Sequence, residues 1–451
     1  MNTRKQQQMP AWLSRTLLIG LGLIYVLMPL HAFLSTWGGT AIGPLWVWKS
    51  WKEILLGGLV LLTLGWLCTK PALLKELVRR PLVIALLAYL VLSLSLAAVF
   101  SSRIESEALL AGLAMNLRYL AAGVLAYIVF CYGGLSANWV LRMCWILLGF
   151  GGLLATIAVA QILLLPPDFL AMFGYDKTTT IAPNLMIDDN PDMLRAFATL
   201  RGPNDFGAFL ILPFILTIAW FRKLPVWVSV WSLLILTWGL ILSGSRSAWI
   251  GLVVAIMTYV GFRLGKRLGW KRVSAIAVVV GIVGLGSLYA AVHVPELRMA
   301  VFHSSPGDSS LTEGSTDDHI SATLGGAERV VEAPLGCGPG CAGPASYYGD
   351  EPKISENYFV QIAEETGIVG LGLFLALVTF VGLKLLRLKE LQDVGRVLFA
   401  ALIGYAVIGL LLHVWADDPL SITWWLLAGA VIGYNERQQW KNSKNSSRSK
   451  T

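Results

Sequence analysis

Long apolar stretches separated by short polar connections make up most of the chain. A helix crosses the hydrocarbon core of a bilayer in about 20 residues, and twelve stretches approach or exceed that length. We expect spans over residues 14–33, 53–69, 82–100, 110–131, 140–165, 204–221, 225–242, 247–263, 273–292, 360–386, 396–414 and 420–435. The pattern predicts an all-α, polytopic membrane protein with about twelve transmembrane helices.

The composition agrees with this fold class. Hydrophobic residues make up 56% of the chain and charged residues only 14%, whereas soluble domains carry about 25% charged residues. The mean hydropathy is +0.67. No small-residue cleavage site follows the first apolar stretch and its basic flank, so we expect an uncleaved anchor and not a signal peptide.

Lysines and arginines gather on one side of the predicted topology. With an even number of spans both termini share a side, and that side holds about two thirds of the 35 Lys and Arg residues. The positive-inside rule makes it the cytoplasmic side. The net charge of +8 is therefore mainly a topology signal, and we find no nucleic-acid-binding motif that would suggest a nucleic acid partner.

Two connections on the opposite side, 166–203 and 293–359, are much longer than the others. Long loops in compact proteins are usually functional or disordered, and these two contain aromatic residues and few charge runs. The chain then divides into N-terminal helices (1–165), a first periplasmic loop (166–203), central helices (204–292), a large periplasmic loop with a catalytic motif (293–359), C-terminal helices (360–435) and a polar cytoplasmic tail (436–451). We expect the chemistry at the periplasmic face and a disordered tail.

Arg246 stands at the outer mouth of a predicted span, in the run Ser243-Gly-Ser-Arg-Ser-Ala-Trp-Ile250. A guanidinium is always charged and is costly to place near hydrocarbon. Serine and glycine suit a helix start, where free backbone N–H groups attract anions. The run predicts a phosphate or pyrophosphate site at the membrane surface. The alternative is an arginine whose long side chain simply reaches water.

Arg195 and Arg201 repeat this arrangement directly before the span that begins near residue 204. Gly202-Pro203-Asn204 is a turn signal, and Asn204 or Asp205 can cap the helix that follows. Two basic groups beside a helix N-terminus again favour an anion site. The alternative is a plain turn with both arginines solvated.

Glycine and proline are dense in Pro334-Leu-Gly-Cys-Gly-Pro-Gly-Cys-Ala-Gly-Pro344, a tight path whose backbone N–H groups can form an anion nest. Cys337 and Cys341 can close a small loop in an oxidising periplasm, but spacing alone does not bring their Cβ atoms together. Glu356 comes just before a hydrophobic helix. Its carboxylate can act as a general base on a hydroxyl, or can merely favour the helix N-terminus.

Three segments in this order, Thr199–Gly207, Ser243–Gly251 and Pro334–Gly370, resemble the O-antigen ligase/polymerase superfamily. Its members are multi-span bacterial proteins that use undecaprenyl-pyrophosphate-linked glycans. The resemblance covers about residues 190–372 and implies basic residues that hold the lipid pyrophosphate. By position Arg195 and Arg246 take that role. Arg118, in Asn116-Leu-Arg-Tyr119, is a further candidate, and we expect Arg201 to contact substrate.

One position departs from the ligase pattern. Ligases of the family carry a His-Asn pair where this chain has Glu356-Asn357. Polymerase-like members place an acidic residue there and a histidine upstream of the Gly-rich loop, which Asp317-Asp318-His319 matches. The resemblance therefore implies Glu356 as the base, with His319 and Asp317 as further catalytic candidates and Asn357 and Tyr358 as groups that orient it or bind sugar. The alternative for His319 is an ordinary solvated loop histidine.

The reaction implied by the resemblance is glycosyl transfer without a nucleotide sugar. A hydroxyl of a glycan or lipid-linked acceptor attacks the anomeric carbon of the donor, and undecaprenyl pyrophosphate leaves. Arginines near the leaving group would stabilise its charge, so we expect no metal and no cofactor. The acidic run Asp188-Asp-Asn-Pro-Asp192 is more simply a solvated loop than a metal site. The place of action would be the bacterial inner membrane, in lipopolysaccharide biosynthesis.

Two other functions stay open beside a polymerase: an O-antigen ligase that acts on lipid A-core, and a polysaccharide transporter or flippase. Transporters tend to place ionisable groups near the midplane, in repeated and broken helices. Here the candidate charges lie at the outer ends of spans, and we see no internal repeat. The pattern favours an enzyme at the periplasmic surface.

The topology can be tested with reporter fusions after residues 180, 320 and 445. We expect periplasmic signals at 180 and 320 and a cytoplasmic signal at 445, because most basic residues lie on the side of the termini. Cytoplasmic signals at 180 and 320 would overturn both the topology and the proposed place of the chemistry.

Overall fold

The computed structural model describes residues 8–187, 190–269 and 315–448 and is built almost entirely of helices. Within these residues ten helices are long and apolar enough to cross a membrane. This confirms the all-α, polytopic membrane fold. The expected span at 273–292 lies outside the described residues, and the expected span at 420–435 lies within a long helix, α16.

The elements follow one another along the chain with short connections except in the two long loops. Their bounds are α1 (Ala11–Leu27), a 3-10 turn (Met28–Leu30), α2 (His31–Ala41), α3 (Leu45–Cys68), α4 (Pro71–Leu77), α5 (Pro81–Phe100), α6 (Ser106–Tyr132), α7 (Ala137–Leu163), η3 (Phe169–Phe173), β1 (Leu185–Ile187), β2 (Asn190–Arg195), α8 (Pro203–Trp220), α9 (Val226–Ser243), α10 (Arg246–Leu268), α13 (Ser315–Glu332), η4 (Gly343–Tyr348), α14 (Tyr358–Leu386), α15 (Gln392–Gly409) and α16 (Asp418–Arg448).

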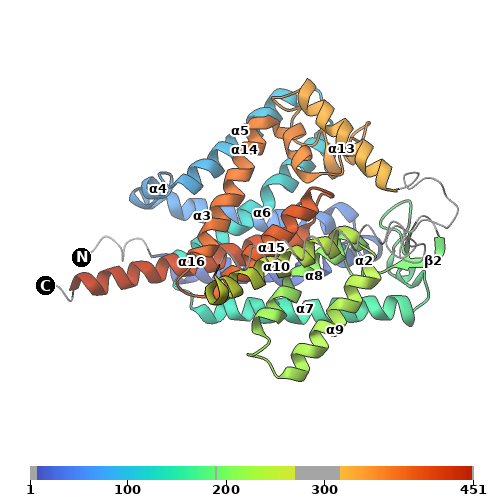
Figure 1. Ribbon diagram of the computed structural model, residues 1–451. Coiled ribbons are helices and arrows are strands. Elements are labelled where there is room, and N and C mark those ends of the chain that lie inside the picture. The colour runs from blue at the N-terminus through green and yellow to red at the C-terminus, as the bar shows by residue number, and fades with distance from the viewer. Residues whose placement is uncertain (1–7, 188–189, 270–314, 449–451) are drawn as a thin grey trace.

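The centre of the bundle is the pair α6 and α16 (Figure 1). Glycines let the two backbones approach closely, because a Cβ at Gly429 or Gly433 would overlap the backbone of Gly123 or Tyr127. Small residues at such crossings are typical of membrane helices, where close packing, and not the hydrophobic effect, drives association. Peripheral helices instead expose apolar side chains, such as Trp227 and Trp231 on α9, which suits contact with lipid.

Both long loops contain regular structure. The first holds η3 and a hairpin of β1 and β2, in which Leu185 pairs with Arg195. The second holds α13 and η4. Figure 1 shows β2 and α13 on the side of the molecule opposite to both chain ends. That both ends lie on the cytoplasmic side stays a prediction.

The expected disordered tail needs correction, because α16 runs on to Arg448. Its polar residues find partners on neighbouring helices. Glu436 lies 2.8 Å from Arg80 and 3.0 Å from Lys384, and Arg437 donates to the Leu135 carbonyl. These contacts stabilise the helix beyond the apolar stretch expected to end at residue 435, and composition alone does not reveal them.

A cluster of buried charges joins four helices inside the bundle. The carboxylate of Asp418, at the start of α16, pairs with Lys52 of α3 at 3.1 Å and with Arg118 of α6. Glu53 lies 3.1 Å from Lys52 and 2.9 Å from Arg118. His31 of α2 lies 2.9 Å from the Lys52 amine. Two acids and two bases thus neutralise one another where water is scarce.

This cluster corrects the expectation that Arg118 binds pyrophosphate. Only 8% of its side chain is exposed, and its guanidinium is shared between Glu53, Asp418 and the Ala416 carbonyl. Two carboxylates already neutralise the charge of Arg118, so the guanidinium has little positive charge left to attract a third anion. Lys52 and Glu53 lie inside an apolar stretch, which is the signal by which the sequence could have revealed the cluster.

We predict that Asp418→Asn lowers the free energy of unfolding by about 3 kcal/mol, because Lys52 and Arg118 would be left buried with only Glu53 between them. Thermal unfolding of the purified protein in detergent measures the loss.

The matched control is Asp393→Asn, which breaks a pair of Lys223 and Asp393 whose side chains are 58% and 37% exposed. Exposed pairs contribute at most about 1 kcal/mol, so the control should unfold close to the wild-type temperature. Equal effects of the two substitutions would show that the buried cluster is not a special source of stability.

Candidate active site

The two arginine-containing segments meet in the folded chain. Arg195, at the end of β2, donates from Nε to the Ser243 carbonyl at 2.9 Å. The next backbone N–H, that of Ala196, donates to the Leu242 carbonyl at 2.8 Å. Residues almost 50 positions apart in the sequence therefore form one surface, with Arg246 at the first position of α10.

Two helix N-termini point into this surface. α8 begins at Pro203 and α10 at Arg246, and they lie close together because Gly207 packs against Ser243, Ser245 and Ala248. Free N–H groups at a helix start favour a bound anion. The expected capping by Asn204 or Asp205 is absent, since neither side chain accepts an N–H of α8. Instead Asn204 accepts a hydrogen bond from Arg195 at 2.8 Å.

The arginines differ in how they are held. Arg195 is fixed by Ser243 and Asn204. Arg246 is partly buried and has no hydrogen bond or ion pair among the described residues. Arg201 is exposed and lies near enough to Asp205 and Asp417 to interact with both carboxylates. Arg246 is therefore the guanidinium most available to a ligand.

Glu356 and His319 come together from different elements. Nδ1 of His319, in α13, lies 3.3 Å from Oε2 of Glu356, which directly precedes the cap of α14. Glu356 has a φ of 49°, in the left-handed region that non-glycine residues rarely occupy, and such strain gathers at functional positions. Both side chains are partly exposed, at 38% and 28%. The sequence placed His319 in a loop, but it lies on a helix.

The charge state of Glu356 follows from its neighbours. Burial raises the pKa of its carboxyl, but the hydrogen bond and the electrostatic interaction with His319 and a smaller interaction with His413 lower it by more, so the pKa ends below its ordinary value. The group is therefore ionised at neutral pH and can accept a proton. Asp317, the other acidic candidate, is a residue of α13 whose side chain lies outside the described part of the chain.

Asn357 and Tyr358 have structural roles in place of the expected contacts with sugar. Asn357 caps α14 by accepting from the N–H groups of Phe359 and Val360, and its amide donates to the Leu410 carbonyl. The Tyr358 ring is 1% exposed, and its hydroxyl is hydrogen-bonded to that of Tyr119 at 2.9 Å. The polar atoms of both side chains are thus hydrogen-bonded to other groups of the protein and not directed at a sugar.

The Gly-rich loop is not an open anion nest, because α14 uses its N–H groups. α14 breaks at Gly367, whose φ is 71°, and the carbonyls of Glu364 and Glu365 lose their helical partners there. They accept instead from Cys337 and Gly338, at 2.8 and 3.0 Å. The Glu365 carboxylate takes the Gly340 N–H at 2.8 Å and the Asn116 amide at 2.6 Å.

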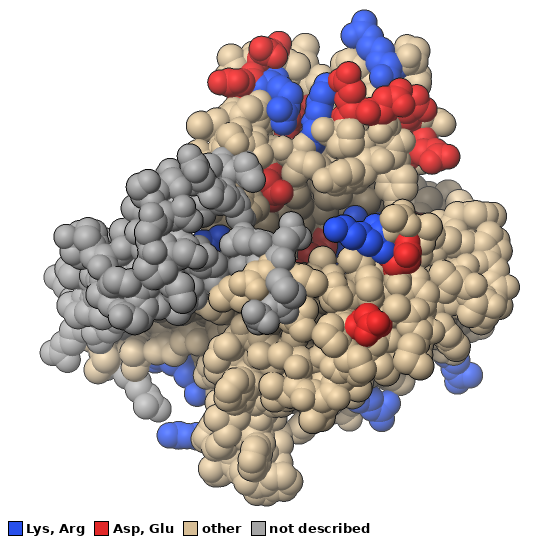
Figure 2. Space-filling model, turned by 90° about the vertical axis from the view of Figure 1, so that its right-hand side faces the viewer, with Lys and Arg blue, Asp and Glu red and all other residues tan. Residues whose placement is uncertain are grey.

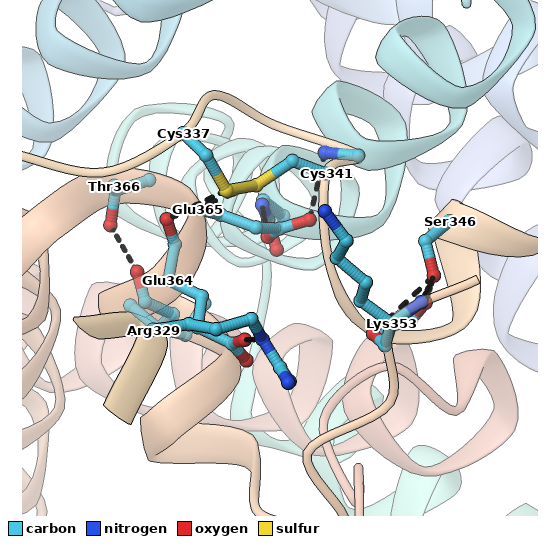
Figure 3. The surroundings of a disulfide bond; sticks show 12 residues. Arg329, Cys337, Cys341, Ser346, Lys353, Glu364, Glu365 and Thr366 are labelled. Carbon is cyan, nitrogen blue, oxygen red and sulfur yellow. Dashed lines mark hydrogen bonds and ion pairs between the residues drawn. A yellow bond between two sulfur atoms is a disulfide. The ribbon is translucent and has the colours of Figure 1, made fainter. Parts of the chain in front are cut away.

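A disulfide joins Cys337 and Cys341 within this loop, with the Cα atoms 6.0 Å apart. Figure 3 shows the disulfide beside Glu364 and Glu365, with Arg329 approaching from α13. The Arg329 guanidinium donates to Glu364 at 2.6 Å. Loop, α13 and α14 thus form one unit, which fixes the position of the segment that carries Glu356.

A space-filling view of the face on the loop side shows a hollow near its centre, with basic and acidic side chains around it (Figure 2). This is the face to which β2 and α13 belong. Such a concave, charged surface beside apolar helices suits a ligand with an anionic head and an apolar tail.

Two comparisons with known proteins bear on this site. The family model for O-antigen ligase matches residues 231–375, which include Arg246, His319 and Glu356. An O-antigen polymerase of Salmonella muenchen is 25% identical over 227 residues. That match covers 49% of this chain and 54% of the relative, so the chain is compared with about half of that protein's length. Over these residues the chain is similar to O-antigen ligases and to an O-antigen polymerase.

Proposed function

We propose that the protein transfers a glycan from undecaprenyl pyrophosphate to a sugar hydroxyl of an acceptor at the periplasmic face. The observation that carries the proposal is the meeting of Arg195 and the Ser243–Arg246 turn at two helix N-termini. Guanidinium groups and helix N-termini both favour a pyrophosphate. The hollow on the same face gives a lipid-linked donor room to approach.

In this proposal Arg246 binds the pyrophosphate and Arg195 supports it. Arg246 has no partner among the described residues, whereas Arg195 holds the Ser243 carbonyl in place and adds positive charge. The leaving pyrophosphate gains negative charge as its bond to the sugar breaks. Preorganised positive groups at that point lower the barrier without a metal ion.

Glu356 would act as the general base. The acceptor hydroxyl oxygen forms a bond to the anomeric carbon of the donor, and the bond from that carbon to the pyrophosphate oxygen breaks. The hydroxyl proton passes to the Glu356 carboxylate, and undecaprenyl pyrophosphate leaves with the electron pair. The lowered pKa of Glu356 and the contact with His319 keep the base ionised and oriented before the reaction.

A polymerase is the function we favour within the family. The relative named O-antigen polymerase and the acidic residue at position 356 both support it. The name of the matching family model supports the second candidate, an O-antigen ligase. The two are distinguished by the acceptor: a polymerase extends a second lipid-linked glycan, and a ligase transfers to lipid A-core. Incubation of the purified protein with donor and each acceptor in turn decides between them.

We predict that Arg246→Ala lowers transfer roughly 100-fold, the usual cost of removing one group that stabilises developing negative charge. Arg246→Lys should restore activity only in part, because an ammonium lacks the planar pair of donors. The assay is transfer from purified lipid-linked glycan. Arg222→Ala, an exposed residue of the α8–α9 connection, is the control and should stay active. Full activity of Arg246→Ala would rule out the pyrophosphate site.

We also predict that Glu356→Gln lowers turnover roughly 100-fold or more, since the amide keeps the shape but accepts no proton. Glu351→Gln, an exposed acidic residue of the same loop, is the control. An active Glu356→Gln enzyme would move the role of base to another group.

The pH profile gives a second test of the same base. His319 lowers the pKa of Glu356, so His319→Ala should raise it and shift the acidic limb of the profile to higher pH. Activity that is present at neutral pH would then be lost earlier as the pH falls. An acidic limb unchanged in His319→Ala would contradict the coupling of the two groups.

A further inference from the structure

His413 lies in the connection between α15 and α16, a segment without any of the sequence motifs discussed above. Two hydrogen bonds tie this connection to the first turn of α14. The Asn357 amide donates to the Leu410 carbonyl at 3.0 Å, and Nδ1 of His413 lies 2.7 Å from Oε1 of Gln361. Because Asn357 follows Glu356 directly, the two bonds bring His413 to the neighbourhood of the proposed base.

The hydrogen bond with Gln361 decides which nitrogen of His413 carries the proton. The Gln361 atom that faces Nδ1 is the amide oxygen Oε1, which can only accept a hydrogen bond. Nδ1 therefore carries the N–H. A neutral ring protonated at Nδ1 has a lone pair at Nε2. Burial lowers the pKa of His413 to about 4, so the ring is neutral at neutral pH.

This Nε2 atom has no donor. It is buried and has no hydrogen-bond partner within the described residues, although buried polar nitrogens are nearly always paired. The ionised Glu356 can only accept, so it offers Nε2 nothing. His413, Glu356 and His319 interact electrostatically, and the bonds to Asn357 and Gln361 hold the connection against the start of α14, so the unpaired nitrogen belongs to the surroundings of the same site.

We propose that Nε2 of His413 accepts a hydrogen bond from a hydroxyl group of the glycan acceptor, and that Gln361 is a positioning residue that keeps this nitrogen unprotonated. A sugar carries several neighbouring hydroxyls. One can donate to Glu356 while another donates to His413, which fixes the face of the sugar that is presented to the donor. The inference rests on the function proposed above and adds a residue that selects and orients the acceptor.

Two substitutions separate this role from a structural one. His413→Asn keeps an N–H near the place of Nδ1, so the contact with Gln361 survives while the acceptor at Nε2 is lost. His413→Gln places an amide oxygen near Nε2 but loses the contact with Gln361. If Nε2 binds the acceptor, His413→Asn should lower kcat/KM for the acceptor roughly tenfold, the size expected for one hydrogen bond, and His413→Gln should keep more activity.

The opposite order, with His413→Asn close to wild type and His413→Gln impaired, would show that the contact with Gln361 is all that matters and would overturn the proposal. Wild-type kinetics in His413→Asn would mean that only water donates to Nε2, with the same consequence. Unfolding temperatures of both variants are measured alongside. If neither folds, Gln361→Met replaces them: it leaves His413 in place but frees its ring, and unchanged acceptor kinetics would overturn the proposal.

Binding of undecaprenyl pyrophosphate distinguishes this inference from the proposed function. His413→Asn should bind the lipid as wild type does, because the substitution leaves Arg246 untouched. A wild-type protein that does not bind the lipid, or an active Glu356→Gln, would defeat the proposed function. An inactive Glu356→Gln together with normal His413→Asn kinetics would defeat the inference about His413 alone.

Discussion

Charges inside an apolar helix bundle must be neutralised by one another, and Asp418 is the group on which this depends. Its carboxylate forms ion pairs with both Lys52 of α3 and Arg118 of α6, and Glu53 pairs with the same two bases. The cost of burying any one of these charges without its partners is large, so the cluster determines which helices lie together and in what register. Glycines of α16 allow it to cross close to α6, the helix that carries Arg118 of this cluster.

The segment before Asp418 connects the buried charges to the loop side of the molecule. The Ala416 carbonyl accepts from Arg118, and the Trp415 ring packs against Tyr119, Tyr405 and Trp424. Earlier in the same segment, Leu410 and His413 are bound to the start of α14. A connection of eight residues thus links the buried charges to the candidate base, which explains how a site built from distant loops can be held still.

The break in α14 performs a similar task on the other side of Glu356. Where the helical hydrogen bonds are interrupted at Gly367, the preceding carbonyl groups need other donors. The Gly-rich loop satisfies them with its own N–H groups, and the disulfide keeps that loop compact. The glycines are needed because Gly336, Gly338 and Gly340 all have φ near 90°, in the left-handed region. The Gly-rich motif is explained by hydrogen bonds from its backbone N–H groups to α14, and not by anion binding.

The sequence alone determined the class of protein, the places of most spans and the position of Arg195, Arg246 and Glu356 near helix ends. Hydrophobic length and basic flanks are local properties, and the bilayer imposes them on each span separately. Only the tertiary structure decided which polar groups are free. Arg118, Asn357 and Tyr358 carry suitable chemistry but are taken by partners far away in the chain, while Arg246 is left without one among the described residues. His413 and Asp418 acquire their importance from contacts with α14, α3 and α6, and such pairing across helices is not encoded in any local pattern.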